Sequence, residues 1–122
     1  MTEKKITIKL SERAPVTIAA KEWPIVARGS WFSGEHECQA NEEAFVRIRQ
    51  HADGRAVVYG LRDRGPGGMP LSYRGTSAGY LLNANASSDE IVRAIRRVAG
   101  VLGHDLAFLA DETIADLPAE AL

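Results

Sequence analysis

The stretch SSDEIVRAIRRVAGVLG, residues 87–103, decides the fold of this chain. At about 100° per residue its apolar side chains fall in one narrow stripe, and these are Ile91, Ile95, Val98 and Leu102. The opposite side carries Arg93, Arg96 and Arg97. The stretch therefore predicts an amphipathic helix with a core side and a basic side.

Both ends of this helix are marked in the sequence. Ser87 and Glu90 have the spacing of a capping box, in which the serine hydroxyl accepts a hydrogen bond from the backbone of the first turn. Asp89 adds negative charge at the positive end of the helix dipole, and Gly103 suits a helix stop. We expect the helix to begin and end with these residues.

Strands are predicted over most of the chain before the helix, because apolar and polar residues alternate there. Residues 5–20 predict a hairpin with a short polar connection. Residues 25–32 follow Trp23-Pro24 and predict a strand that ends at a turn. Residues 35–40 predict a short returning strand.

The clearest hairpin signal is Asp53-Gly54, since a two-residue type I′ turn needs positive φ at both positions. This turn predicts the opposing pairs Ile48 with Tyr59, Val46 with Leu61 and Gln50 with Val57. One face of the hairpin then collects most of the apolar residues. The other face would carry Phe45, Arg47, Arg49, Val58, Gly60 and Arg62.

The remaining segments are shorter. Residues 62–70 are rich in glycine and proline and predict a loop. Residues 71–74 and 80–82 predict short strands around a turn at 75–79. After residue 104, a second short helix is compatible with the spacing of apolar residues, with Asp111 as its cap.

Strands followed by one helix predict an α+β fold, a mainly antiparallel sheet of short hairpins with the C-terminal helix packed across one face. The length and the apolar content suit a single domain with its own core. We expect residues 1–104 to form that domain and residues 105–122 to form an acidic tail, with or without a short helix.

The charges are unevenly distributed, although the formal net charge is only -1. Residues 44–104 hold all nine of their positive charges as arginine, against four acidic residues, whereas residues 105–122 hold five acidic residues and no basic ones. Arginine offers a planar fork that suits phosphate, carboxylate and aromatic partners. The middle of the chain is therefore the region where a charged partner is expected.

Catalytic, metal and cofactor motifs are not predicted. His36 and Cys38 share one face of a predicted strand, but zinc needs three or four converging ligands. Glu35 and Glu37 would raise the pKa of the Cys38 thiol, which argues against a nucleophile. The glycine-rich residues 65–68 match neither dinucleotide nor P-loop spacing. We expect no cofactor and favour a protein that is not an enzyme.

The arginines support the one functional hypothesis that the residues carry, a non-enzymatic interaction or regulatory module. Its partner would be a protein or a nucleic acid, and the choice stays open, because the chain as a whole lacks the high isoelectric point of nucleic-acid binders. Ordinary helix stabilisation also explains part of the arginine pattern. The predicted contact residues are Arg47, Arg49, Arg62, Arg64, Arg93, Arg96 and Arg97.

Two alternatives remain at this stage. Trp31 and Phe32 put bulk on both sides of one strand, so that strand is either buried within the monomer or meets a second copy in a homodimer. A small-ligand binder or enzyme would instead use a pocket between sheet and helix. Its polar groups would come from Tyr59, Tyr73, Tyr80 or His36.

Three segments carry a resemblance, and they are residues 22–26 (EWPIV), 34–39 (GEHECQ) and 59–68 (YGLRDRGPGG). In these the chain resembles a group of small, uncharacterised accessory proteins encoded by proteobacterial plasmids and integrative conjugative elements. The resemblance implies a mobile-element setting, in which small regulators and binders are common. With no apolar signal core near residue 1 and no apolar run as long as a membrane span, we expect a cytoplasmic protein.

Overall fold

The structure, a computed structural model, describes residues 4–33, 41–65 and 75–118. Four strands form one antiparallel sheet in the order β3-β4-β5-β6, and these are β3 (Ile25–Ser33), β4 (Asn41–Gln50), β5 (Ala56–Gly65) and β6 (Gly75–Leu82). A separate antiparallel hairpin consists of β1 (Lys5–Ile8) and β2 (Val16–Ala19). The C-terminal part holds α1 (Ser88–Leu102), a 3-10 turn η2 (His104–Leu106) and α2 (Ala107–Ala115). The predicted α+β class is confirmed.

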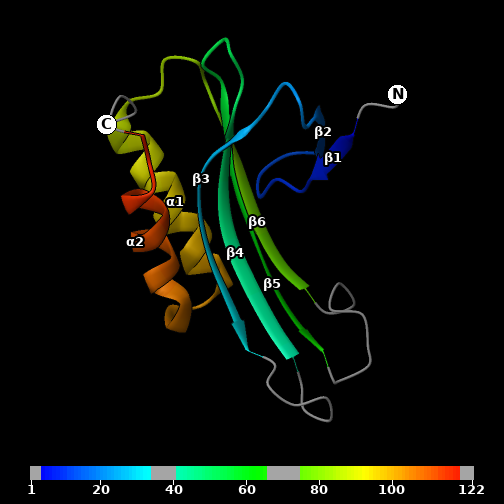
Figure 1. Cartoon of the computed structure of the whole chain (residues 1–122), viewed down its shortest axis with the longest axis vertical. Coiled ribbons are helices and arrows are strands. Elements are labelled where there is room, and N and C mark those ends of the chain that lie inside the picture. Colours follow the sequence, from blue (N-terminus) through cyan, green and yellow to red (C-terminus); the bar gives the residue numbers. More distant parts are fainter. Residues whose placement is uncertain (1–3, 34–40, 66–74, 119–122) are drawn as a thin grey trace.

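The elements form three layers (Figure 1). Both helices cover one face of the four-stranded sheet, and the β1-β2 hairpin lies on the other face, near one end of the strands. We call the face that the helices cover the helix face, and the opposite one the open face. No helix among the described residues is both long and apolar enough to cross a membrane.

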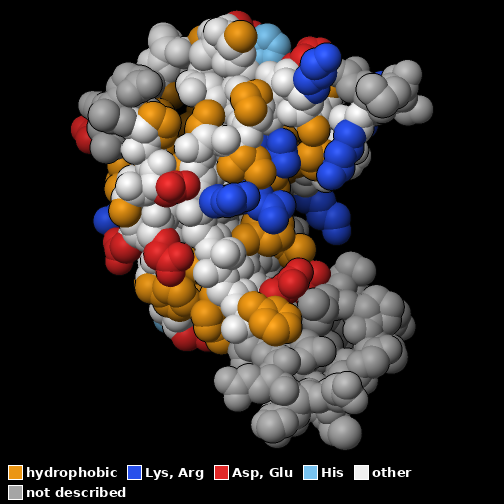
Figure 2. Space-filling model, in the orientation of Figure 1, with side chains coloured by type: hydrophobic (Ala, Val, Ile, Leu, Met, Phe, Trp, Pro, Cys, Tyr) orange, Lys and Arg blue, Asp and Glu red, His pale blue; other side chains and the backbone are white. Residues whose placement is uncertain are grey.

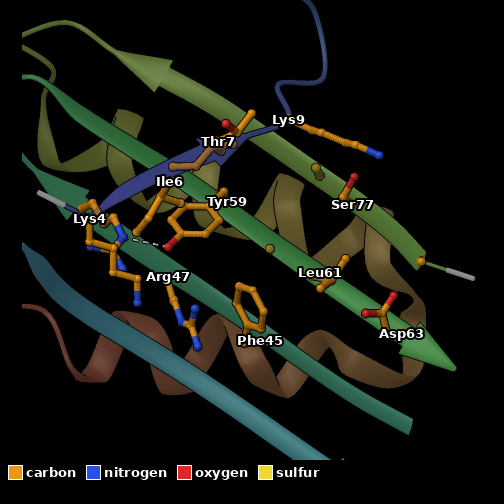
Figure 3. A pocket seen from close by; sticks show the side chains of 15 residues that line it. Lys4, Ile6, Thr7, Lys9, Phe45, Arg47, Tyr59, Leu61, Asp63 and Ser77 are labelled. Atoms are coloured by element: carbon orange, nitrogen blue, oxygen red, sulfur yellow. Dashed lines mark hydrogen bonds between the residues drawn. The ribbon is translucent and has the colours of Figure 1, made fainter. Parts of the chain in front are cut away.

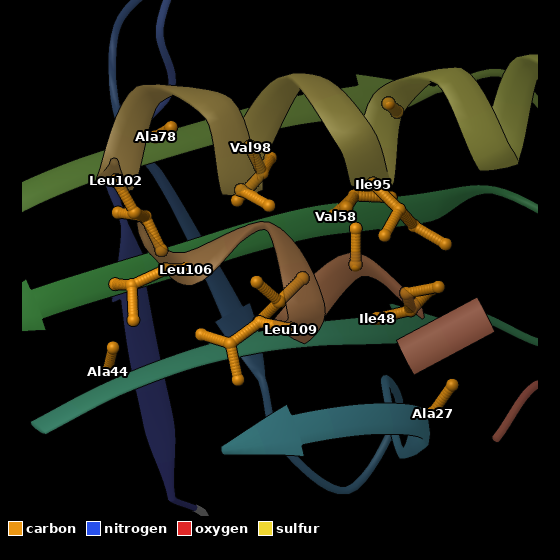
Figure 4. Packing of buried hydrophobic residues seen from close by; sticks show 14 of the residues in the cluster. Ala27, Ala44, Ile48, Val58, Ala78, Ile95, Val98, Leu102, Leu106 and Leu109 are labelled. Atoms are coloured by element: carbon orange, nitrogen blue, oxygen red, sulfur yellow. The ribbon is translucent and has the colours of Figure 1, made fainter. Parts of the chain in front are cut away.

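The main core lies between the helix face and the helices (Figure 4). Ile95 and Val98 of α1 are fully buried, and Val46 and Ile48 of β4 are buried with them in one cluster. Leu102 is also buried and Ile91 is half-buried at the edge of the cluster. The apolar stripe predicted from residues 87–103 therefore packs on the sheet, as expected.

The predicted ends of α1 are also confirmed. The Ser87 hydroxyl accepts a hydrogen bond from the Glu90 backbone N–H at 3.2 Å. Gly103 follows the helix with a φ of 144°, a value that L side chains rarely adopt, and its N–H donates to the Ala99 carbonyl. Local sequence signals are sufficient here because each cap involves residues only a few positions apart.

The segment after residue 104 packs into the main core. Leu106, Leu109 and Thr113 are fully buried, and α2 contacts β3 and α1. The second helix begins at Ala107, so Asp111 lies inside it and does not cap it. In the described part of this segment, Asp105, Asp111, Glu112 and Asp116 are exposed, whereas Leu106, Leu109 and Ala110 belong to the main core. The described part of the expected tail therefore packs on the sheet and on α1.

The β4-β5 hairpin is present, but its predicted register is wrong by one residue. Ile48 pairs with Val58 and Arg47 pairs with Tyr59. The connection spans residues 51–55: the His51 N–H donates to the Arg55 carbonyl, and only Gly54 has a positive φ. A longer connection shifts the pairing, and the shift puts Val58 and Gly60 on the helix face in place of Tyr59 and Leu61.

Two further predictions need correction. Residues 62–65 belong to β5 and not to a loop, and residues 75–79 belong to a continuous β6 and not to a turn. Gly79 allows β6 to lie close to the segment that follows β1. A Cβ at Gly79 would lie 2.5 Å from the Lys9 carbonyl oxygen, and the Gly79 carbonyl accepts a hydrogen bond from the Ser11 N–H at 2.8 Å. The strands predicted at 35–40 and 71–74 lie outside the described residues.

A second, smaller core joins the hairpin to the open face. Its buried members are Ile8, Ile18, Trp23, Val57 and Tyr59. The hairpin covers only part of the open face, because β1 and β2 have four residues each, whereas β4 and β5 have ten. The rest of that face carries the candidate site.

Candidate functional site: a groove on the open face

The seven arginines chosen from the sequence do not share one surface. Arg47 lies on the open face and lines a groove. Arg49 and Arg62 are held inside the fold by hydrogen bonds. Arg93, Arg96 and Arg97 lie on the solvent side of α1, beyond the other face of the sheet. The side chain of Arg64 is outside the described residues.

Arg49 and Arg62 act as structural residues. Arg49 is buried, and it donates from Nε to the Tyr59 hydroxyl at 2.8 Å and from Nη1 to the Trp23 carbonyl at 3.0 Å. Arg62 pairs with Glu42 and Asp105 and also donates to the Leu102 carbonyl at 2.9 Å. Its hydrogen bonds to Asp105 and then to Glu42 raise the pKa of Arg62, against the opposing effect of its burial. Arg62 lies on the helix face, away from the groove, and Arg49 lines the groove but is buried with its guanidinium hydrogen-bonded inside the fold.

The helix arginines differ from one another. Arg96 lies 3.3 Å from Asp111, and Arg97 lies 3.8 Å from Glu12, with its guanidinium 5.1 Å from the centre of the Tyr80 ring. Such exposed ion pairs contribute little free energy, typically about 0–1 kcal/mol. Arg93 is exposed to solvent. These residues give α1 a basic outer side but no concave site.

The groove lies between β1 and the uncovered part of the open face, and its volume is about 490 Å³. Its sheet side chains come from β4, β5 and β6. Ile6, Thr7 and Ile8 of β1 line the other side, with Lys4 just before that strand and Lys9 just after it. Figure 2 shows basic side chains gathered on the hollowed side of the molecule below the hairpin, with acidic and hydrophobic ones closer to the far ends of the strands. The volume falls in the range of roughly 300–1,000 Å³ that is usual for ligand pockets.

The strand register arranges the open face in three rows that cross the sheet. The cationic row contains Arg28, Arg47 and Tyr59. The middle row contains Ser30, Phe45, Leu61 and Ser77. The acidic row contains Phe32, Glu43, Asp63 and Gly75. Figure 3 shows this order along the groove, from Lys4 and Arg47 at one end, past Phe45 and Leu61, to Asp63 at the other.

The cationic and middle rows are joined by aromatic contacts. The Arg47 guanidinium carbon lies 3.9 Å from the centre of the Phe45 ring. The rings of Phe45 and Tyr59 pack edge to face, with their centroids 6.0 Å apart. Tyr59 is held in turn by Arg49. The Phe45 ring thus holds the Arg47 guanidinium in position, while Arg47 stays half-exposed at the groove.

Asp63 at the other end has the least satisfied side chain. It is 3% exposed, and its Oδ1 accepts no hydrogen bond in the part of the chain that the structure describes. Burial raises the pKa of the Asp63 carboxyl above 3.8, and the charge of Glu43 raises it further. A buried carboxylate oxygen without a donor is unusual in a folded protein and calls for an explanation.

The groove continues towards the edge of the sheet. A shallower hollow of about 260 Å³ runs beside it and is lined by Phe32, Glu43, Phe45 and Arg47 among others. Phe32 is 60% exposed on this face, whereas Trp31, its neighbour in β3, packs against the main core. The exposed phenyl ring therefore adds apolar surface at the acidic row.

The alternative pocket between sheet and helix is not found at its expected place, because the fully buried side chains of the main core fill that space. Of its proposed polar groups, Tyr59 lines the groove and Tyr80 packs on the helix face. His36 and Tyr73 are outside the described residues, as are Cys38 and residues 66–68 of the glycine-rich loop. Among the described residues, no group of three or more His, Cys, Asp or Glu side chains is placed to hold a metal ion.

Comparison with protein-family models, with curated proteins and with solved structures gives no significant match. The site must therefore be interpreted from its own chemistry.

Sequence reasoning missed the acidic end and the lysines of the groove. Asp63 falls in the predicted loop of residues 62–70, although it continues the alternation of Val57, Tyr59 and Leu61 along β5. The predicted contact residues are all arginines and include neither Lys4 nor Lys9, which line the groove. The period-two pattern that runs through residue 63 was the signal available for extending β5.

Proposed function

We propose that this protein is a non-enzymatic binding module, and that its partner is a protein that docks in the groove of the open face. The observation that carries the proposal is the combination of a half-exposed, preorganised Arg47 with apolar and acidic groups in one groove. Protein interfaces combine such groups, with arginine and aromatic residues contributing much of the affinity.

A nucleic-acid partner is less well supported by the same groove. Phosphate contacts require positive charge along the path of the backbone. Here Asp63 and Glu43 lie two rows from Arg47, and a phosphate at their end would be repelled. The mixed charge of the groove favours a partner that presents both signs, as protein segments do.

The setting of this binding event is part of the proposal. We infer a cytoplasmic regulator or interaction module of a mobile genetic element, as the resemblance of three segments to accessory proteins of plasmids and conjugative elements implies. A homodimer formed through β3 is a second hypothesis, favoured by the exposed Phe32. Size-exclusion chromatography with light scattering tests it, since replacing Phe32 with Ser would convert a dimer to a monomer.

The main proposal is tested by charge reversal at two arginines on opposite sides of the sheet. Tagged wild-type protein, Arg47→Glu and Arg93→Glu are purified from the native host, and the co-purifying proteins are quantified by mass spectrometry. We expect a partner that Arg47→Glu loses and Arg93→Glu retains. Thermal unfolding of both variants serves as the folding control, because neither side chain is buried.

The opposite result would refute the groove assignment. If Arg93→Glu loses the partner and Arg47→Glu retains it, the helix arginines carry the binding. If neither variant loses a protein, but Arg47→Glu weakens the salt-dependent binding of a labelled single-stranded oligonucleotide, the partner is a nucleic acid.

A further inference from the structure

The two charged residues Arg62 and Asp63 show why the acidic end of the groove needs a partner. They are adjacent in β5 and point to opposite faces of the sheet. On the helix face, Arg62 is matched by two carboxylates and a carbonyl. On the open face, Asp63 is buried, and the neighbouring charge that affects its pKa is that of another carboxylate, Glu43.

The surroundings of Asp63 define what would satisfy it. Its Oδ1 lacks a donor among the described residues, and the carboxyl lies on the groove beside Leu61 and Gly75. A Cβ on Gly75 would come 2.3 Å from Oδ1, so the backbone of β6 closes one side of the carboxyl. None of the basic side chains that line the groove, which are Lys4, Lys9, Arg47 and Arg49, is among the groups that shift the pKa of Asp63. Because Oδ1 is buried, the Asp63 side chain must turn towards the groove for a bound cationic donor to supply both the charge and the hydrogen bond.

The spacing of the rows defines the shape of the ligand. Arg47 pairs with Tyr59, and Asp63 lies four residues farther along β5. At roughly 3.3 Å per residue this separates the cationic and acidic rows by about 13 Å, with the middle row half-way between them. An extended peptide places its residues i, i+2 and i+4 on one side with the same spacing. Three alternate side chains of one extended segment therefore match the three rows.

We propose that the groove binds an extended segment of the partner protein that sets a Lys or Arg side chain against Asp63, an apolar side chain over Phe45 and Leu61, and an acidic side chain beside Arg47. This inference rests on the proposed function and adds the sequence pattern of the bound segment. The pattern has an acidic and a basic residue four positions apart with an apolar residue between them. Its opposite charges complement those at the two ends of the groove.

The test uses the full chain and a phage-displayed library of random 12-residue peptides. Wild-type protein is expected to enrich peptides with the proposed pattern, and Asp63→Asn is expected to lose the preference for the basic residue. The asparagine side chain has nearly the same size, but it is neutral and replaces one acceptor oxygen with an amide donor. Thermal unfolding verifies that Asp63→Asn is folded before the selection.

A double-mutant cycle then isolates the contact with Asp63. The affinity of one selected peptide is compared with that of the same peptide with norleucine in place of its Lys, for both wild-type protein and Asp63→Asn. We expect Asp63→Asn to weaken the lysine peptide about tenfold or more and the norleucine peptide less than about twofold. A purely structural role of Asp63 would weaken both peptides alike.

Two outcomes would overturn the inference. The first is a library that enriches no peptide dependent on Asp63, and the second is equal weakening of the two peptides. The purification with Arg47→Glu is independent of these outcomes. It can therefore still identify a protein partner that binds the groove without an extended segment of this pattern.

Discussion

Arg62 and Asp63 belong to the same strand, yet the two faces of the sheet treat their charges in opposite ways. On the helix face, Arg62 is 16% exposed and bonds to Glu42, Asp105 and the end of α1. On the open face, Asp63 is even more buried, and one of its oxygens lacks a donor among the described residues. The helix face completes the contacts of its charged group, whereas on the open face we propose that a ligand completes them.

The same contrast holds for apolar side chains. On the helix face, a layer from two helices covers Val46, Ile48 and Val58 completely. On the open face, a hairpin with strands of four residues covers only part of strands of ten residues, and Phe45 and Leu61 remain half-exposed. Function is expected where the covering layer ends, because a contact that the fold completes is not available to a partner.

The largest expected effect compares one leucine from each face. Leu109→Ala removes a fully buried side chain from the main core and should lower the free energy of unfolding by about 2–5 kcal/mol. Leu61→Ala removes a half-exposed side chain from the groove and should cost about 1 kcal/mol. Urea denaturation of both variants provides the comparison. Equal losses would mean that the groove is packed like the core.

The next effect concerns the satisfied charge. Arg62→Met leaves Glu42, Asp105 and the Leu102 carbonyl without this guanidinium and should lower stability by about 2–3 kcal/mol. Arg96→Met is the matched control, because its ion pair with Asp111 is exposed and should be worth less than about 1 kcal/mol. A small loss of stability in Arg62→Met would show that the ion pairs and the hydrogen bond of Arg62 contribute little to the free energy of unfolding.

The unsatisfied charge should behave in the opposite sense. Asp63→Asn is expected to raise the free energy of unfolding at pH 7 by about 1–2 kcal/mol, because it removes a buried carboxylate that lacks a donor. The raised pKa means that the folded state holds the proton more tightly than the unfolded state. The stability of the wild type relative to Asp63→Asn should therefore fall as the pH rises above 3.8 through the folded-state pKa.

Thermal unfolding of both proteins across this pH range measures the difference, and the other carboxyl groups cancel in it. A variant that is less stable than the wild type at pH 7 would show that Asp63 is a structural residue. That result would also weaken the case for a cationic group of the partner at this position.

The smallest expected effect is at Arg47. Its contact with the Phe45 ring is half-exposed, so Arg47→Ala should change stability by less than about 1 kcal/mol while it weakens partner binding. Thermal unfolding and the purification experiment together measure the two effects. A large loss of stability would place Arg47 among the structural arginines, with Arg49 and Arg62.

Much of the local structure is predictable from the sequence. The caps of α1 and the alternation of β1 and β2 depend on residues within a few positions of one another. The register of β4 and β5 is not, because Asp53-Gly54 also fits a connection of five residues. The position of Gly79 inside β6 is not predictable either, since the reason for a glycine there is the approach of Lys9 from the hairpin.

The arginines show the same limit at the candidate site. Arg47 and Arg49 are two residues apart and point to the same face, but only Arg49 is buried, where it bonds to the Trp23 carbonyl in the segment between β2 and β3. Period two predicts that the two side chains are equivalent. Their difference depends on where a separate segment ends on the sheet, and no pattern within β4 contains that information.

By itself the sequence determined the α+β class, the amphipathic helix with its two caps and the faces of the first strands, because hydrogen bonding and side-chain direction repeat over a few residues. Only the tertiary structure decided which charges are neutralised inside the fold. Arg62 meets Glu42 from 20 positions away and Asp105 from 43 positions away, whereas Oδ1 of Asp63 meets no donor in the part of the chain that the structure describes. Electrostatic pairing depends on distance in space, and for segments this far apart in the chain only the packing of the layers sets that distance.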